Sequence, residues 1–247
     1  MRRQLKSRAI ILSGRDLGES DRIITFLTRD HGRLSAVAKG ARRSKRRFTG
    51  ALEIFSLVEV CATDLGHELL TLDSCDLTHA WPNIRADVRR YGQACYLCEL
   101  ARELFPEREP ARDAFALLAL ALERLSAAEG DPPWELLAEL RLLSLAGFAP
   151  RLTSCRCGAP VEAAARFYPA HGGVLCPRCA PPGAEATLAS VGTLRLLGEA
   201  ARLELAKVGR LRFSRLALEE SARLLTALAR HTLGKELKSR KFLESLA

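Results

Sequence analysis

The spacing of apolar residues changes at Trp81-Pro82, and this change separates a part built of strands from a part built mainly of helices. Before it, short apolar segments alternate with turn residues, which is typical of strands. The segments expected to form strands are residues 8–13, 21–28, 33–38, 52–61 and 68–73. Five strands within about 70 residues favour a small closed β-barrel, and among such barrels the OB-fold commonly binds oligonucleotides.

Beyond this point apolar residues recur every three or four positions, the repeat of an amphipathic helix. The first expected helix begins near Ile84 and ends before Pro106, and the others cover residues 112–127, 133–146, 191–208, 214–233 and 235–246. A stretch rich in Cys, Pro and Gly interrupts them and is expected to be a small module built of loops. The chain is therefore predicted to be an α+β multidomain protein with an OB-fold domain at 1–80, a helical domain at 81–149 and 184–247, and an inserted module at 150–183.

The inserted module contains two pairs of thiols, Cys155 with Cys157 and Cys176 with Cys179, but too few large apolar residues to form a core. A tetrahedral zinc ion held by four thiolates would supply the missing folding free energy. The second pair has the usual C-x-x-C spacing, whereas the first is one residue tighter, so His171 is the substitute ligand if geometry excludes one cysteine. We expect one structural Zn²⁺ in a zinc-ribbon-like module, with an unliganded relic loop as the alternative.

The other four cysteines lie within regular elements and are expected to be inert. Cys95 and Cys98 have C-x-x-C spacing but fall on the apolar stripe of the first helix, which predicts buried, inert core cysteines. Cys61 and Cys75 resemble residues of strand interiors.

Catalytic motifs that would suit a zinc-bearing chain are absent from the sequence. His67-Glu68 is not followed by the second histidine of an H-E-x-x-H metalloprotease. The H-x-E and P-C-x-x-C motifs of nucleic-acid deaminases and the phosphate-binding P-loop are also missing. The acidic residues at positions 16, 19, 21 and 30 suggest a nuclease metal site only weakly, because acids at turns more often cap them. We therefore expect a binding protein and not an enzyme.

Positive charge is concentrated towards the two ends of the chain. The formal net charge is +9, with +4 in residues 1–80, −1 in residues 81–194 and +6 in residues 195–247. The densest cluster follows the expected third strand and consists of Lys39, Arg42, Arg43, Lys45, Arg46 and Arg47. At the rim of a barrel such a cluster favours nucleic acid as the partner, and an incidental solvated loop is the alternative.

No segment is expected to enter a membrane or to direct export. The longest wholly apolar run, residues 114–122, is nine residues long, and a membrane-spanning helix needs about 18 or more. The basic first eight residues are followed by an apolar run that is too short for a signal peptide.

Six short runs spread along the chain point to a known family. They are LGESDRI at 17–23, FLT at 26–28, HGRL at 31–34, AKGARR at 38–43, GFAPRL at 147–152 and LKSRKFL at 237–243. These runs resemble the RecO family of bacterial recombination mediators. The first cysteine pair departs from the family pattern, because many zinc-bearing members have C-x-x-C there.

The resemblance implies an OB-fold domain, a helical domain with an inserted zinc module, and work on DNA in the cytoplasm, at the nucleoid. RecO-like proteins bind single- and double-stranded DNA, anneal complementary strands and contact the C-terminal tail of single-strand binding protein. With RecR, and in some pathways RecF, they help RecA replace that protein on DNA. Arg33, Lys39, Arg42 and Arg43 match the family's basic barrel motif, and Lys45, Arg46 and Arg47 extend it by charge alone.

Two features bear on how such a chain would hold its partners. Aromatic residues that could stack bases are sparse in the barrel, where Phe26, Phe48 and Phe55 are the only ones and at least two of them are expected to be core. The C-terminal basic region alternates cations with an apolar stripe of Leu194, Leu197, Ala201 and Leu205. This stripe suggests either a groove for an acidic peptide or an ordinary helix face.

A zinc-ribbon regulatory module whose barrel binds RNA or protein is the alternative function of the chain.

Overall fold

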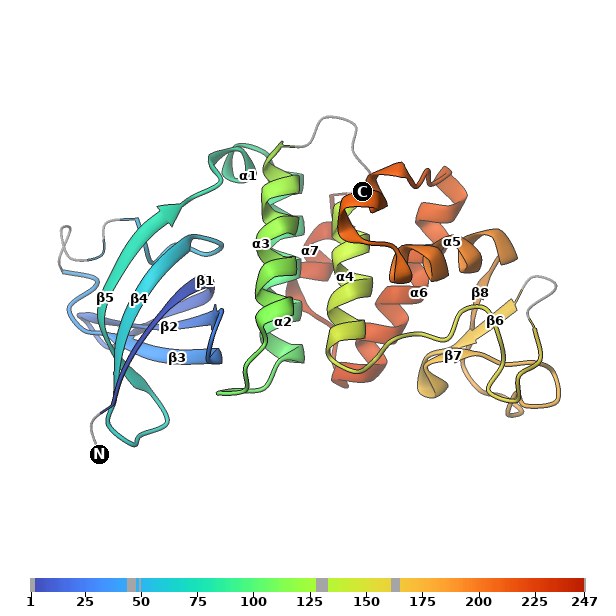
Figure 1. Cartoon of the computed structure of the whole chain (residues 1–247), viewed down its shortest axis with the longest axis horizontal. Helices are drawn as coiled ribbons and strands as arrows, with labels where there is room; N and C mark the ends of the chain where they lie inside the picture. The colour runs from blue at the N-terminus through green and yellow to red at the C-terminus, as the bar shows by residue number, and fades with distance from the viewer. Residues whose placement is uncertain (1–2, 44–47, 49, 128–132, 161–164, 247) are drawn as a thin grey trace. The chain divides into compact units, whose positions relative to one another are not determined.

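The fold is described from a computed structural model of the chain, which places residues 3–43, 48, 50–127, 133–160 and 165–246. It consists of two compact units (Figure 1). The first unit comprises Met1–Ala127 together with Leu237–Ala247, and the second comprises Ala128–Glu236. The barrel, the first three helices and the last helix thus form one unit, and the remaining helices and the cysteine-rich module form the other.

Five strands close into a barrel in the order β1-β2-β3-β5-β4 (Figure 1). The strands are β1 (Arg3–Leu17), β2 (Asp21–Thr28), β3 (Gly32–Ala38), β4 (Leu57–Asp64) and β5 (Leu70–His79). All neighbours are antiparallel except β3 and β5, which are parallel and pair Ala36 with Leu70. A five-stranded barrel of this kind is the OB-fold, so the predicted fold class is confirmed.

The strand boundaries differ from the expected ones where pairing extends beyond an apolar run. Strand β1 runs well past residues 8–13, because it pairs with both β2 and β4. A register shift between Ile11 and Ser13 bends it, as bulges do in small barrels. The fourth strand begins at Leu57 and not at residue 52, since Phe55 has a left-handed backbone (φ 53) that ends the preceding turn.

The helices of the first unit are α1 (Pro82–Ala86), α2 (Val88–Leu104), α3 (Arg112–Ala127) and α7 (Lys238–Glu244). The expected helix after Pro82 is broken at Asp87, which has an extended backbone. The Asp87 side chain accepts a hydrogen bond from the Arg90 N–H and so caps the N-terminus of α2. Within α2, Cys98 is fully buried and burial raises the pKa of Cys95 to about 11. Cys98 is therefore a residue of the helical core, as predicted, whereas Cys95 is half-buried.

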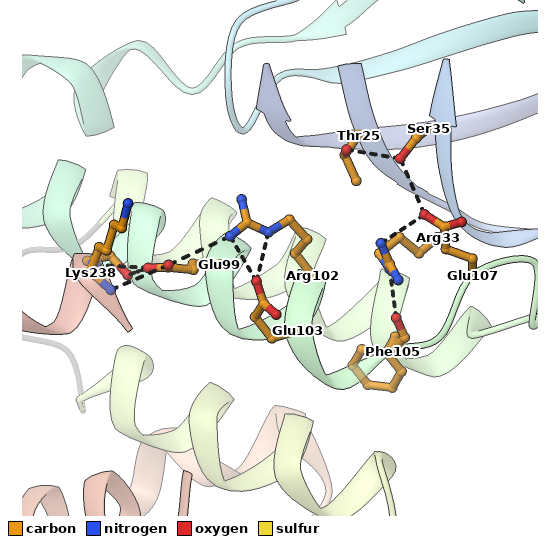
Figure 2. A network of polar contacts seen from close by, with 10 residues as sticks. Thr25, Arg33, Ser35, Glu99, Arg102, Glu103, Phe105, Glu107 and Lys238 are labelled. Atoms are coloured by element: carbon orange, nitrogen blue, oxygen red, sulfur yellow. Dashed lines mark hydrogen bonds and ion pairs between the residues drawn. The ribbon is translucent and has the colours of Figure 1, made fainter. Parts of the chain in front are cut away.

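The C-terminal helix α7 returns to α2 and is held there by a carboxylate. Glu99 accepts hydrogen bonds from the Ser239 N–H at 2.9 Å, the Lys238 N–H at 3.4 Å and the Ser239 hydroxyl (Figure 2). Gly92 allows the close approach, because a Cβ there would lie 2.8 Å from Leu243 Cδ2. Residues 237–247 thus belong to the barrel's unit, although they follow the whole second unit in sequence.

The second unit contains α4 (Trp134–Leu145), α5 (Val191–Arg202), α6 (Arg215–Leu233) and the short 3₁₀ helices Pro169–His171 and Leu205–Arg210. It also contains a small sheet of order β7-β6-β8, formed by Gly173–Val174, Ala165–Tyr168 and Thr187–Ala189. The expected helix at 191–208 ends at Arg202, because Leu203 is extended. No helix in the described part of the chain is long and apolar enough to span a bilayer.

A buried carboxylate joins α5 to α6. Glu220 on α6 accepts hydrogen bonds from the Ser190 N–H at 3.0 Å, the Ser190 hydroxyl at 2.8 Å and the Thr193 hydroxyl. Burial alone would raise the pKa of Glu220, but the hydrogen bonds from Thr193 and Ser190 outweigh it and hold the pKa below its usual value. The ionised side chain therefore stabilises the first turn of α5.

We expect Glu220→Gln to lower the free energy of unfolding by about 1.5–3 kcal/mol at neutral pH, because it removes hydrogen bonds to a charged group. Because the folded pKa of Glu220 is lowered, its contribution is present above the unfolded value of 4.5 and is lost as the pH falls through the folded value. Urea unfolding from pH 7 to pH 3 measures this. Glu219→Gln is the control, since its exposed pair with Arg215 is worth less than about 1 kcal/mol. Equal losses for the two variants would contradict the prediction.

Candidate functional site

The basic loop begins at Lys39, directly after β3, and its first turn packs against the turn between β1 and β2. The Asp21 carboxylate accepts hydrogen bonds from the Gly40 N–H at 2.8 Å and the Ser20 hydroxyl at 2.7 Å. The hydrogen bonds from Gly40 and Ser20 lower the pKa of Asp21. The Arg42 N–H donates to the Ser20 carbonyl at 3.0 Å. These contacts fix the first turn of the loop to the barrel.

Arg42 and Arg43, the two described arginines of this loop, differ in how many contacts their side chains make with the turn between β1 and β2. Arg42 donates to the Gly18 carbonyl at 2.8 Å and pairs with Asp16 at 3.3 Å, so its guanidinium helps to hold the turn. Among the described residues, the Arg43 guanidinium pairs with Glu19 at 3.4 Å, and the Arg43 side chain is 70% exposed. Lys39 is also exposed. The predicted residues Lys45, Arg46 and Arg47 lie outside the described residues.

Arg33 lies at the other end of β3 from the loop, about 20 Å along a strand of this length. Its guanidinium donates to the Phe105 carbonyl at 2.8 Å and pairs with Glu107 at 3.0 Å (Figure 2). Its side chain is only 23% exposed. The structure therefore separates Arg33 from the rest of the predicted group and engages it between the barrel and the segment after α2. Sequence reasoning missed Glu107, because the two partners are 74 positions apart.

The acidic residues near the turns do not form a metal site. Asp16 pairs with Arg22 at 3.6 Å as well as with Arg42, and Asp30 pairs with Arg112 at 3.2 Å at the opposite end of the barrel. Glu19 pairs with Arg43, and Asp21 is engaged by the Gly40 N–H and the Ser20 hydroxyl. Within the described ranges, the four-cysteine group is the one cluster whose geometry suits a metal ion.

The four predicted cysteines of the module come together. The sulfur atoms of Cys155, Cys157, Cys176 and Cys179 all lie within 4.8 Å of one another, and Cys157 Sγ is 3.7 Å from Cys176 Sγ. Zinc–sulfur bonds of about 2.3 Å in a tetrahedron place the sulfurs about 3.8 Å apart. The cluster therefore has the ligand number and spacing to hold one tetrahedral metal ion.

Two different turns bring the cysteine pairs to this point. The second pair forms a knuckle in which the Cys179 N–H donates to the Cys176 carbonyl at 2.9 Å. In the shorter first pair, the Gly158 N–H donates to the Cys155 carbonyl at 2.9 Å, and Gly158 takes the left-handed backbone that this turn requires (φ 87). His171 is not in the cluster and faces Tyr168 instead, so no substitute ligand is needed.

The cluster is electrostatically prepared for a cation. The N–H groups of Cys157 and Cys176 donate to Cys155 Sγ and lower the pKa of Cys155 to about 6. Hydrogen bonds to the sulfurs of Cys157, Cys155 and Cys176 in turn stabilise the protonated Cys179 and raise its pKa to about 11. A bound cation would favour the thiolate form of all four cysteines, so metal binding and loss of the thiol protons are coupled.

The fold and the site define a class of protein that combines an OB-fold barrel bearing a basic loop with a helical part bearing four clustered cysteines able to hold a metal ion. The model named Recombination protein O N terminal matches residues 1–81, and the model named Recombination protein O C terminal matches residues 85–241. The chain belongs to the RecO family.

Full-length relatives support the same assignment. Proteins named DNA repair protein RecO from Anaeromyxobacter dehalogenans (strain 2CP-C) and Myxococcus xanthus (strain DK1622) are 39% and 40% identical to the chain. The first alignment covers 98% of this chain and 97% of the relative, and the second covers 95% of each. A protein of the same name from Symbiobacterium thermophilum is 36% identical over 96% of this chain and 95% of its own length.

Proposed function

We propose that this chain is a DNA-binding mediator of recombinational repair that anneals complementary strands and catalyses no reaction. The observation that carries the proposal is the basic loop, whose first turn is anchored to a closed OB-fold barrel while Lys39 and Arg43 remain exposed. Membership of the RecO family and the name of its relatives, DNA repair protein RecO, support it. Lys39, Arg42, Arg43, Lys45, Arg46 and Arg47 are the residues that we expect to follow the phosphate backbone.

The positive charge of the basic loop explains how the protein would anneal complementary DNA strands. A cationic surface that holds two strands lowers their mutual repulsion and raises their local concentration. The same surface accepts single- and double-stranded DNA, because phosphate contacts carry no sequence information. Loading of RecA on DNA coated by single-strand binding protein, with RecR and in some pathways RecF, in the cytoplasm at the nucleoid, is part of this proposal.

The tail of single-strand binding protein is a proposed partner without an assigned site. Leu194 and Leu197, which were candidates for the floor of a peptide groove, are buried within the second unit. These two leucines are therefore helix core and do not form the floor of an open groove.

A single structural Zn²⁺ in the four-cysteine cluster completes the proposal. Four sulfur ligands in a tetrahedral arrangement suit zinc, and such closed sites contribute folding free energy and leave no position open for catalysis. Cys155, Cys157, Cys176 and Cys179 would be its ligands.

Salt dependence tests the proposed DNA binding. Four to six phosphate contacts on a single strand predict a slope of log K against log salt concentration of about −3 to −4. Changing Arg43, Lys45, Arg46 and Arg47 to Gln should make the slope shallower by about 2 to 3 and slow annealing at least tenfold. Arg42 is left in place because it holds the turn. Fluorescence anisotropy and an annealing assay without ATP measure the two effects.

Arg33→Gln is the companion variant. A phosphate contact by Arg33 would make the slope shallower by about 0.7, whereas its contacts with Phe105 and Glu107 favour no change. An unchanged slope in the quadruple variant would contradict the assignment of the loop. Tighter binding of RNA, or of a protein, than of DNA would favour the alternative of a regulatory module.

A further inference from the structure

The aromatic residues of the barrel cannot supply stacking surfaces for bases. Phe26 and Phe55 are fully buried and Phe48 is 5% exposed. Proteins that bind single strands without sequence preference usually stack bases on exposed aromatic rings. A strand held by the basic loop would therefore find its base contacts elsewhere in the first unit.

An exposed apolar patch lies where α2 begins, beside α7. Val88 is 61% exposed, Tyr91 38% and Phe242 40%. Val88 precedes Tyr91 by three positions and Gly92 by four, so the three share one face of α2. The Phe242 ring packs on Gly92, where a Cβ would lie 3.1 Å from Phe242 Cε1. Val88, Tyr91 and Phe242 thus form one surface, here called the α2–α7 patch.

Contacts with neighbouring residues hold the Tyr91 and Phe242 rings of this patch in place. Tyr91 meets the buried Phe55 edge to face, with ring centroids 5.3 Å apart. Phe242 belongs to α7, which Glu99 fixes to α2 through the hydrogen bonds to Lys238 and Ser239. A ring that is already fixed loses little conformational entropy when a base stacks on it.

Two arginines lie close in sequence to the start of α2, where the patch is. The Arg85 guanidinium lies 4.9 Å from the centre of the Phe55 ring, and Arg89 is exposed on the first turn of α2 without an ion pair or hydrogen bond to any described residue. Burial raises the pKa of Tyr91, and the smaller contributions of the Arg85 and Glu53 charges lower and raise it respectively. Cations at the rim suit a polyanion better than an apolar partner.

A row of ion pairs leads from Glu53 to the basic loop. Glu53 pairs with Arg22 at 3.9 Å, Arg22 with Asp16 at 3.6 Å, and Asp16 with Arg42 of the loop at 3.3 Å. The charge of Glu53 also contributes to the raised pKa of Tyr91, so this row begins near the patch.

We propose that the α2–α7 patch stacks unpaired bases of a single DNA strand whose phosphates follow the basic loop. The inference rests on the proposed function, because it names where that strand's bases are held. Val88 and the rings of Tyr91 and Phe242 supply the stacking surface, and Arg85 and Arg89 accompany the backbone.

The test compares an oligothymidylate with an abasic oligonucleotide of equal length and charge. The parent should bind the oligothymidylate more tightly by about 5- to 150-fold for each stacked base. The double variant Tyr91→Ala with Phe242→Ala should lose this preference and keep both its affinity for the abasic strand and its salt slope. Phe148→Ala is the matched control, because Phe148 is 45% exposed but lies in the second unit. Tyr91→Phe keeps the ring and should keep the preference.

The outcomes separate this inference from the proposed function. A preference for the oligothymidylate that survives in the double variant, or that disappears in Phe148→Ala, overturns the inference alone. Loss of affinity for an acidic peptide without any change for DNA assigns the patch to a protein partner and overturns it as well. Absence of salt-dependent DNA binding in the parent overturns both proposals. Thermal unfolding and retained binding of the abasic strand show whether the double variant is folded.

Discussion

Cys176→Ser should abolish stoichiometric zinc binding and unfold the module at residues 150–183. The apolar cluster of this module is small and is formed by Cys155, Tyr168 and Leu175. Metal binding contributes about 10–16 kcal/mol to the folding of small structural zinc modules, which is more than such a cluster can supply. Removal of one of four thiolates therefore removes most of the free energy that holds the module together.

Metal analysis of protein purified without chelator measures the first effect, and limited proteolysis of the module measures the second. The parent should carry about one equivalent of zinc, and the variant less than a tenth of that. Cys61→Ser is the control, because Cys61 lies in β4 and is not part of the cluster. A parent with less than half an equivalent of metal, or a variant with a full equivalent, would contradict the assignment.

Gly32→Ala should lower the free energy of unfolding of the first unit by about 2–5 kcal/mol. Gly32 begins β3 with a left-handed backbone (φ 70), and a Cβ at this position would lie 1.7 Å from the Glu109 carbonyl oxygen. The substitution thus combines backbone strain with a collision against main-chain atoms, and neither can be relieved by a rotamer change. The loop that contains Glu109 would have to move away from the barrel.

Gly18→Ala separates the two causes. Gly18 has nearly the same backbone (φ 60), but nothing lies within 4 Å of the position that its Cβ would take. This control should lose only about 1–2 kcal/mol, the cost of the left-handed backbone. Urea unfolding measures both variants, and equal losses would show that the contact with Glu109 does not matter for stability.

The contact at Gly32 is one of several that make the barrel and the helices of the first unit a single body. The Arg108 N–H donates to the Arg33 carbonyl at 2.9 Å, so the segment after α2 pairs with β3 as a short extra strand would. The Arg108 side chain pairs with Asp64 at 2.6 Å at the end of β4. The barrel and the helices that follow residue 81 therefore belong to the same compact unit. The change near residue 81 is a change of secondary structure and not a boundary between units.

The class of fold and the metal cluster could be predicted from the sequence because both depend on local patterns. Alternating apolar residues placed the five strands, and helical spacing placed α2 and α6 within a few residues. The ligand cluster followed from the spacing of four cysteines in a segment without a core. The boundaries that the sequence missed, at Leu57, Asp87 and Arg202, are places where backbone conformation or strand pairing decides and side-chain polarity does not.

The roles of individual side chains depended on contacts between distant residues. In the sequence, nothing distinguishes Arg33 from other cations of a strand. Its engagement depends on Glu107, 74 positions further along the chain, with which it pairs in the folded protein. Phe242 becomes part of an exposed aromatic surface only because α7 returns to Gly92. Local sequence thus determined which elements this protein has and which cysteines cluster. Tertiary structure decided which cations of the basic loop remain exposed and which rings reach the surface, because pairing and burial are set by neighbours that the chain brings together only on folding.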